Sequence, residues 1–373
     1  EFGSWAASWT ILLIAGHAAS LGFSESVVRY YTTHAARGEW SRARGFLISG
    51  SLVAIVFASL MSGLACTLLL VFQQHLPAGM YGPLLLAALA LPLFAFQDWL
   101  EGVARAFGRP VLALAPVYLL RPVCIAAILT GLAMAGHSAD ASTAMAAVLA
   151  AIALATAVQG LFVCRAAPQQ LFQVKSNHGK IAWIIGSAPL ALAFLIDQLA
   201  AYADILALAV TVPSSETGAY FAAARIIALA SLAPYAVSVI AGRDFAFHHA
   251  SGDAAGLLAS VRRTTRWTFW ASTALLLVLL LTGPLLLSMF GRGFLVAAPC
   301  ISLLALGLVA RAAGGHGEDL LMALGHQAHT VRIATLSALV ALGLAFIATP
   351  LFGLTGAAAA MTCAAAIRSV LFV

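Results

Sequence analysis

The sequence predicts an all-α integral membrane protein built as a two-lobed helical bundle. Of its 373 residues, 62% are hydrophobic and only 9% are charged, whereas a soluble domain carries about 25% charged residues. Such a chain has too little polar surface to face water, so most of its exterior must face lipid. Its apolar stretches recur at about the 20 residues that cross a bilayer. They show no alternation of apolar and polar residues, which favours helices over barrel strands.

We expect eleven helices, several of them bounded by prolines such as Pro110 and Pro350, because proline cannot continue a helix. The expected segments are 3–30, 46–73, 83–106, 110–136, 143–164, 181–211, 216–243, 265–290, 295–323, 328–349 and 353–373.

Basic and basic-poor loops alternate between these segments. Arg37, Arg42 and Arg44 follow the first helix, the next loop has no Lys or Arg, and Arg105 and Arg109 follow the third helix. The alternation continues along the chain. Under the positive-inside rule the basic loops are cytoplasmic, which predicts a multi-pass protein whose basic loops share one side of the membrane. The net charge of +6 therefore reflects topology, and we expect no nucleic-acid partner.

The chain repeats itself at an offset of about 215 residues. Three pairs of short matches share this offset: 2–5 with 217–220, 34–39 with 249–253, and 105–108 with 322–325. Corresponding loops fall on the same side of the membrane, so the repeat is parallel, with an axis along the membrane normal.

The repeat predicts lobes of six helices each. We expect an N-terminal lobe at 1–164, a cytoplasmic linker at 165–180 and a C-terminal lobe at 181–373. The helix at 181–211 has no counterpart in the first lobe. The first helix of that lobe is therefore expected upstream of residue 1, leaving eleven of twelve helices here.

The sequence carries no motif for nucleophilic catalysis, zinc-dependent hydrolysis, phosphate cradling or dinucleotide binding. Its five cysteines lie singly in or beside apolar segments without metal-ligand spacing, so we interpret them as packing residues. We expect a protein that is not an enzyme and needs neither cofactor nor metal. Its energy would come from an ion gradient, the membrane potential or the cargo gradient.

Several short motifs resemble one family of transporters. Residues 204–209 and 216–220, read as Asp-Ile-Leu-Ala-Leu-Ala and Glu-Thr-Gly-Ala-Tyr, are similar to the start of the second lobe in bacterial polysaccharide flippases. Residues 21–39 resemble that family's second helix and loop, and 321–325 and 350–358 resemble its last helices. These flippases are the O-antigen and exopolysaccharide-unit translocases of the multidrug/oligosaccharidyl-lipid/polysaccharide (MOP) exporter superfamily.

This resemblance implies a central cavity between two six-helix halves and alternating access as the mechanism. The implied cargo is a polyprenyl-pyrophosphate-linked oligosaccharide, a lipid-linked unit moved from the cytoplasmic to the periplasmic leaflet. The implied pathway is the biosynthesis of lipopolysaccharide or exopolysaccharide. The implied surrounding is the lipid bilayer of a bacterial inner membrane, with a polysaccharide polymerase and chain-length machinery as further partners.

Three arginines lie near mid-helix: Arg121, Arg225 and Arg311. Each is roughly 15 Å from its nearer helix end, and charges at that depth are costly unless they face protein or water. Guanidinium groups bind phosphate oxygens bidentately. We therefore expect these arginines to form a cationic cavity that holds the pyrophosphate. The alternative is that each joins helices by pairing with a buried acid or a backbone carbonyl.

Four acids are candidates for ion coupling or for counter-ions to those arginines: Asp197, Asp204, Glu318 and Asp319. Asp197 and Asp204 are seven residues apart in one expected helix, so they share a face. The other two end a stretch from Arg311 that contains three glycines, which predicts an irregular segment lining protein or water. The counter-ion alternative is slightly favoured for the aspartates.

Arg29 and Arg105 approach cytoplasmic helix ends, each four residues after a glutamate. Pairs at this spacing are usually structural, but both arginines are also candidates for contacting an anionic headgroup at the cytoplasmic mouth. Asp98 extends the face of Glu101 and is a candidate gate residue. His17 is expected to be a packing histidine with a satisfied ring rather than a proton relay.

Other functions remain open. A cation-coupled multidrug exporter of the same superfamily would need acidic and aromatic residues around its cavity. A membrane glycosyltransferase would need large loops with catalytic acids, and the expected loops reach only about 20 residues. A transport-dead scaffold is a fourth possibility. The excess of mid-helix arginines favours the flippase.

Overall fold

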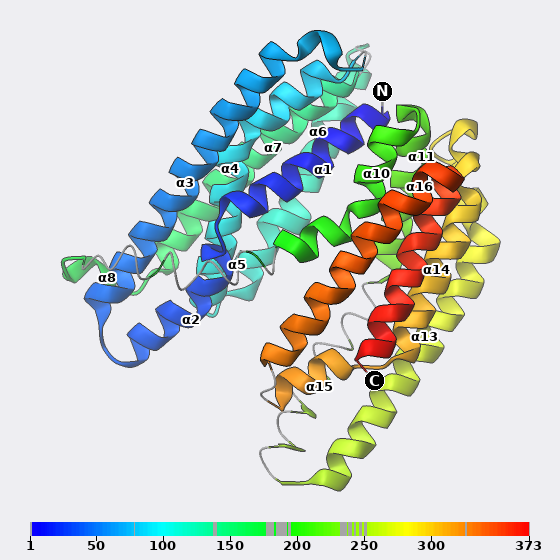
Figure 1. The fold of residues 1–373 in the computed structure, drawn as a ribbon. Coiled ribbons are helices and arrows are strands. Elements are labelled where there is room, and N and C mark those ends of the chain that lie inside the picture. Colours follow the sequence, from blue (N-terminus) through cyan, green and yellow to red (C-terminus); the bar gives the residue numbers. More distant parts are fainter. Residues whose placement is uncertain are drawn as a thin grey trace. The chain divides into compact units, whose positions relative to one another are not determined.

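The computed structural model describes residues 2–77, 79–136, 140–176, 183, 192, 195–231, 237, 241, 244–245, 248–249, 252–324 and 327–372. All regular secondary structure within these ranges is helical, which confirms the predicted fold class. The chain folds into two compact units, Glu1–Leu195 and Ile196–Val373 (Figure 1). The finer limits predicted for the lobes and the linker stay a prediction.

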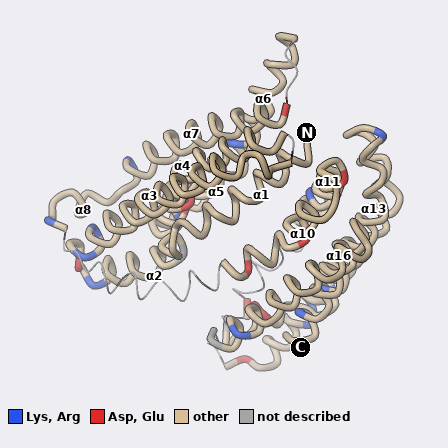
Figure 2. Tube along the Cα trace, turned by 45° about the horizontal axis from the view of Figure 1, so that its top comes forward, with Lys and Arg blue, Asp and Glu red and all other residues tan. Residues whose placement is uncertain are grey.

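Seven of the described helical segments are long and apolar enough to cross a bilayer. They are Trp40–Val71, Tyr81–Ala106, Pro110–Met134, Ala141–Ala166, Ala254–Ser288, Arg292–Leu321 and His329–Leu371. The chain is thus a multi-pass α-helical membrane protein. Charged residues are sparse along its helices, and the basic residues of the first unit gather chiefly at the end where α2 and α8 lie (Figure 2).

The first unit is a bundle around α4. Its elements are α1 (Phe2–Ala19), α2 (Phe23–Ala36), α3 (Trp40–Val71), η1 (Gln73–His75), α4 (Tyr81–Ala106), α5 (Pro110–Ala115), the π-helical turn η2 (Pro116–Leu120), α6 (Arg121–Met134), α7 (Ala141–Ala166) and α8 (Gln170–Gln173). Helix α4 contacts α1, α2, α3 and α7. Gly102 of α4 meets the Ser24 carbonyl and Gly50 of α3 meets Trp99 so closely that a Cβ would have no room at either glycine.

The second unit comprises α10 (Ala203–Thr211), α11 (Ser214–Ala230), α13 (Ala254–Ser288), the 3₁₀ turn η3 (Arg292–Ala297), α14 (Ala298–Ala313), α15 (Gly317–Ala323) and α16 (Gln327–Leu371). Helix α16 consists of two helices joined at Gly353, which has φ 57° and ψ −136°. The junction can form at this position because glycine tolerates positive φ. It lies where the sequence predicts the boundary between the last two helices.

Aspartates begin two of the helices. The Thr143 N–H donates to the Asp140 carboxylate over 2.7 Å at the start of α7, and the Gly256 N–H donates to Asp253 over 2.8 Å at the start of α13. Both caps satisfy a backbone donor that has no partner inside the helix. A hydrogen bond from the Thr143 side chain, together with this backbone bond, lowers the pKa of Asp140. The Gly256 N–H lowers the pKa of Asp253.

The loop before α3 is also ordered by an acid. Glu39 accepts from His34 Nδ1 over 2.7 Å and from Arg42 Nη1 over 3.1 Å. The hydrogen bond from His34, reinforced by Arg42, lowers the pKa of the Glu39 carboxyl.

Some predicted helix boundaries were wrong. The helix predicted at 3–30 is broken at Leu21 and Gly22, which have φ 47° and 70°, and continues as α2 to Ala36. Helices α3 and α13 begin earlier than predicted, at Trp40 and Ala254, because each carries arginines within its first three turns, which a search for apolar segments leaves out. Of the helices predicted at 181–211 and 216–243, most of 181–194 and of 232–243 lies outside the described residues.

Candidate functional site

An ionic cluster centred on Arg368 links three segments of the second unit. Arg368 lies near the end of α16, and its Nη2 donates to Glu318 Oε1 and Oε2 over 3.2 and 2.9 Å. Its Nη1 donates to Asp197 Oδ1 over 3.2 Å. The Arg368 side chain is 24% exposed, against 50% for Asp197 and 39% for Glu318. The guanidinium thus joins α15 and the segment before α10 to the last helix.

A cavity of about 230 Å³ adjoins this cluster. Its charged lining consists of Asp197, Arg311 and Arg368, and the rest is mostly small residues, chiefly alanines of α16 and of the segment 196–201. Small-molecule sites usually measure about 300–1,000 Å³. Within this unit the cavity is therefore smaller than a typical small-molecule site, with room for an ion and its waters or for one phosphate group.

The local backbone explains why Glu318 reaches Arg368. Helix α14 ends at Ala313, Gly314 packs against Ser369 and Gly315 adopts φ +71°. The chain then turns into α15, which begins at Gly317. This break lies in the glycine-rich stretch that the sequence marks as irregular, and it moves the acid out of the line of α14.

Asp319 and Asp204 have partners other than an arginine. Asp319 Oδ2 is 3.1 Å from His316 Nδ1, and His316 Nε2 is 2.9 Å from the Thr268 hydroxyl. Asp204, which is 4% exposed, accepts from the Tyr220 hydroxyl over 2.7 Å. It also accepts from the Ile205 N–H over 2.8 Å.

Asp197 and Asp204 do not act as one pair. The helical path is interrupted at Tyr202, with φ −122° and ψ 14°, so the seven-residue spacing no longer places both on one continuous face. Asp197 borders the cavity as a counter-ion of Arg368, whereas Asp204 is buried between α10 and α11. Asp197 thus has the geometry of a counter-ion. Its partner is Arg368, which the sequence analysis did not name as a candidate.

Arg225 of α11 is stacked on aromatic rings. Its guanidinium carbon lies 4.5 Å from the Phe221 ring centroid and 5.8 Å from that of Tyr202. The side chain is half-buried. Among the described residues it donates no hydrogen bond, although Asp204 lies near enough for a Coulombic attraction. Stacking occupies the flat face of a guanidinium and leaves its N–H edge available.

Arg121 of α6 has a similar setting in the first unit. Its guanidinium lies 5.2 Å from the Trp9 ring centroid and 5.6 Å from that of Phe94. Its Nη1 donates to the Gln97 amide oxygen over 3.3 Å. The chain forms a π-helical turn just before it, over Pro116–Leu120.

Two other predicted groups have structural partners. Arg105 Nε lies 3.9 Å from Glu101 Oε1, which fits the helical ion pair expected from their spacing. His17 Nδ1 lies 3.0 Å from Asp98 Oδ1, so this histidine has the satisfied ring expected and ties α1 to α4. The side chain of Arg29 lies outside the described part of the structure.

The structure brings together only part of the predicted cationic cavity. Arg311 shares its cavity with Asp197, and Arg225 lies by Asp204, while Arg121 belongs to the other unit. Convergence of the three arginines on one cavity stays a prediction. Sequence reasoning missed Arg368 and Tyr220. The signal for Arg368 was available, because it is a lone charge in an otherwise apolar segment.

The fold is that of known transporters. An inward-facing multidrug resistance MATE family transporter of the MOP superfamily matches with a TM-score of 0.81 and 11% identity, over 99% of this chain and 90% of that one. A MOP superfamily transporter from Pyrococcus furiosus matches at 0.68 and 13%, over 100% and 88%. An outward-facing MATE structure matches at 0.67 and 14%, over 98% and 85%. No family model and no curated protein matches.

At these identities the likeness defines the fold alone. The chain is a multi-pass helical membrane protein with the fold of MATE transporters of the MOP superfamily.

Proposed function

We propose that the chain is a flippase that carries a polyprenyl-pyrophosphate-linked oligosaccharide from the cytoplasmic to the periplasmic leaflet of a bacterial inner membrane. Alternating access is supported by the fold, because the similar MATE structures are described as inward-facing and outward-facing. The product would enter surface polysaccharide biosynthesis, with a polymerase and chain-length machinery downstream. The transport step requires no catalytic residue in this chain.

The observation that carries the proposal is the state of Arg225. Its flat face rests on Phe221 while no described residue accepts its N–H groups. A half-buried guanidinium whose N–H groups have no acceptor among the described residues can bind a phosphate or pyrophosphate, which accepts two parallel hydrogen bonds. Arg225 and Arg121 also cover the faces of Phe221 and Trp9. A lipophilic cation would need such aromatic faces for cation–π contacts.

The carboxylates of the ionic cluster would balance the positive charge of Arg368. With Asp197 and Glu318 as its counter-ions, Arg368 is stabilised when no anion is bound. An arriving anionic headgroup would compete with these carboxylates for guanidinium groups, which links cargo binding to the contacts between α15 and α16. Arg311, on the same cavity, is the second candidate for the headgroup.

The second candidate function is export of multidrug-type cations. The similarity to structures described as multidrug resistance transporters favours it. In that case the working groups would be acids such as Asp204 rather than Arg225.

The test is replacement of Arg225 by Ala and by Lys, with exposed Arg332→Ala as the matched control. Purified protein in liposomes would be assayed for flipping of a fluorescent polyprenyl-pyrophosphate-linked sugar, and cells for surface polysaccharide and for ethidium efflux. We expect the Ala variant to lose flipping, the Lys variant to lose most of it, and the control to keep it. The flippase proposal would be overturned if the Arg225→Ala variant flipped the lipid-linked sugar normally, or if it lost ethidium efflux and kept flipping.

A further inference from the structure

The internal repeat places the long helices α3 and α13 in register. Each helix follows a loop in which a glycine with φ 70°, Gly38 or Gly252, precedes an acidic N-cap residue. The N-cap residues are Glu39 and Asp253, and each lies within hydrogen-bonding distance of a histidine five residues upstream. The two loops are thus built alike at an offset of 214 residues, which is the separation of the two acids.

The buried faces of the two helices keep the same offset. The face of α13 that points into the second unit begins with four hydroxyl side chains spaced four residues apart: Ser260, Thr264, Thr268 and Ser272. The corresponding positions of α3 are also buried, and they are Phe46, Gly50, Ala54 and Ala58. The outward faces therefore correspond as well and can be compared position by position.

These outward faces differ in chemistry. On α3 two successive outward positions are Leu52 and Val56, which are 49% and 53% exposed, as expected of side chains that meet lipid. The corresponding positions of α13 are Arg266 and Trp270, and Arg262 lies one turn before them. Because the fold accepts aliphatic side chains at these positions in the first unit, packing does not require the arginines in the second.

Arg262 and Arg266 have no partner among the described residues. Both side chains are exposed, and within the described part of the chain neither forms a hydrogen bond or an ion pair. Arg263 differs, because its Nη2 lies 3.5 Å from the carboxylate of Asp244. Residues four apart lie on the same helix face. Two guanidinium groups on one face with their N–H groups available complement the oxygens of a phosphate.

The two arginines lie at the level of lipid headgroups. From Trp267 to Leu287 the helix carries no charged residue, and it rises by roughly 30 Å, which is the thickness of a bilayer's hydrocarbon core. Trp267 and Trp270 are 66% and 63% exposed, as in the aromatic belt at a membrane interface. The basic turns just before them therefore meet the phosphates, and the positive-inside rule assigns this end to the cytoplasmic leaflet.

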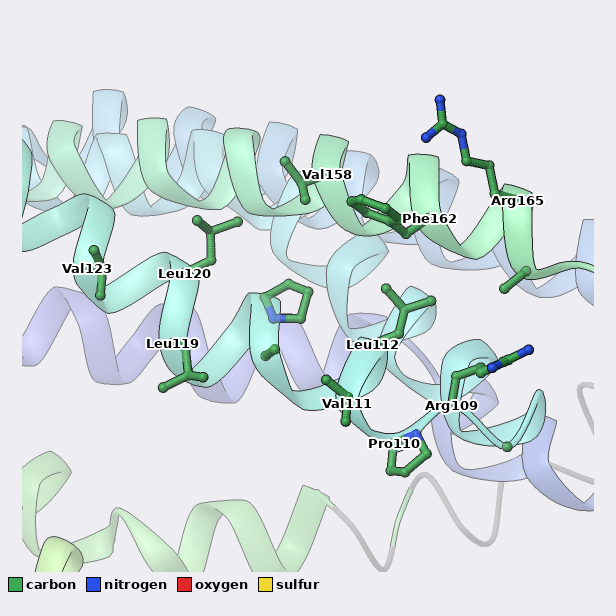
Figure 3. A pocket seen from close by; sticks show the side chains of 14 residues that line it. Arg109, Pro110, Val111, Leu112, Leu119, Leu120, Val123, Val158, Phe162 and Arg165 are labelled. Atoms are coloured by element: carbon green, nitrogen blue, oxygen red, sulfur yellow. The ribbon is translucent and has the colours of Figure 1, made fainter.

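The first helix that the repeat assigns to each lobe does not cover this face. In the second unit its described part, 196–211, packs on both halves of α16 through small residues such as Ala200 and Ala207. The equivalent place in the first unit is the apolar groove between α5–η2–α6 and α7 (Figure 3). Helix α13 packs on α14 and η3 instead, so its outward face is left to the lipid.

We propose that the cytoplasmic end of α13 binds an anionic phospholipid, with the lipid phosphate between Arg262 and Arg266 and the acyl chains along the exposed face from Trp270 onward. The paired guanidinium groups supply the complementary charge, and the apolar face next to them continues into the hydrocarbon. The site is independent of the proposed cargo.

The experiment uses the native Trp267 and Trp270 as fluorescent reporters. Their emission is the difference between the spectra of the wild type and of the Trp267→Phe/Trp270→Phe variant. Both proteins are reconstituted in phosphatidylcholine vesicles that contain either brominated phosphatidylglycerol or brominated phosphatidylcholine. The reference reporter is Val56→Trp in the Phe variant, because this position of α3 corresponds to Trp270 and the two preceding turns carry no arginine.

We expect phosphatidylglycerol to quench the native reporters at a mole fraction at least about fivefold lower than phosphatidylcholine, because one basic residue at the membrane surface already favours anionic lipid by that factor. The reference reporter should show no preference. The Arg262→Gln/Arg266→Gln variant should lose the preference while quenching by phosphatidylcholine stays unchanged, which shows that the protein is folded in the membrane.

The matched control is Arg37→Gln/Arg109→Gln, which removes the same charge from exposed arginines in other basic loops and should keep the preference. The proposal would be overturned by equal quenching of the native reporters by both lipids, or by an equal preference at the reference reporter. A preference that survives Arg262→Gln/Arg266→Gln, or that disappears in the control, would overturn it as well.

Discussion

Removing Arg368 should destabilise the second unit, and chiefly through Glu318 rather than Asp197. The two bonds to Glu318 are bidentate, with N–O distances of 3.2 and 2.9 Å, whereas Asp197 receives one bond of 3.2 Å. Hydrogen bonds to charged groups contribute about 1.5–3 kcal/mol when buried, and exposed ion pairs about 0.2–1 kcal/mol. Glu318 is 39% exposed and Asp197 50%. Discounting for screening leaves about 1–2 kcal/mol for the Arg368–Glu318 pair and under about 1 kcal/mol for the Arg368–Asp197 pair.

Two double-mutant cycles measure these couplings directly. Arg368→Ala is combined with Glu318→Ala in one cycle and with Asp197→Ala in the other. Unfolding in mixed micelles of rising dodecyl sulfate content, followed by circular dichroism, gives the free energies. Exposed Arg332→Ala serves as a control and should change stability by less than about 0.5 kcal/mol. Coupling energies within about 0.3 kcal/mol of zero in both cycles, or a larger coupling to Asp197, would refute this reading of the cluster.

Three further outcomes are expected. Tyr220→Phe leaves the buried carboxylate of Asp204 without its hydroxyl donor and should cost about 1–3 kcal/mol of unfolding free energy; a change below about 0.5 kcal/mol would argue against that bond. Gly102→Ala forces a methyl group against a carbonyl of α2 and should cost about 1–3 kcal/mol, whereas Gly63→Ala, which meets nothing within 4 Å, should be neutral or slightly stabilising; equal effects would contradict the packing. The folded-state pKa of Glu39 is lowered, so its stabilising effect is present above the unfolded pKa and is lost as the pH falls through the folded value. Glu39→Gln should therefore flatten the acid side of a melting-temperature profile, and an unchanged slope would count against the loop contacts.

The membrane-bundle fold could be predicted from the sequence because lipid imposes a composition on every spanning helix. The segments at 83–106 and 143–164 correspond closely to α4 and α7, and the glycine at 353 marks the reversal within α16. Helix starts were less predictable. Trp40 and Ala254 begin helices that carry arginines within their first three turns, and the break at Leu21 depends on backbone angles that no periodicity reveals.

The site was predictable in its residue types but not in its pairings. Burying a charge is costly wherever it occurs, so the sequence alone identifies Arg121, Arg225, Arg311 and the acids as groups that need partners. Which partner each one finds depends on turns between helices. Arg368 meets Glu318 because the chain breaks after α14, and Asp204 meets Tyr220 because α10 and α11 pack together.

The apolar composition and the alternation of basic loops thus determined that this chain lies in a membrane as a helical bundle. Both signals depend only on local residue type, because lipid selects apolar segments and basic loops stay on the cytoplasmic side. The tertiary structure alone decided that the Gln159 side chain donates to the carbonyls of Leu112 and Ala113 beside Pro116, and that Arg368 near the end of α16 binds two carboxylates. Such contacts join residues that are 46 to 171 positions apart. Hydrogen bonds and ion pairs act over a few ångströms in space, so the sequence separation of two groups says nothing about whether they meet.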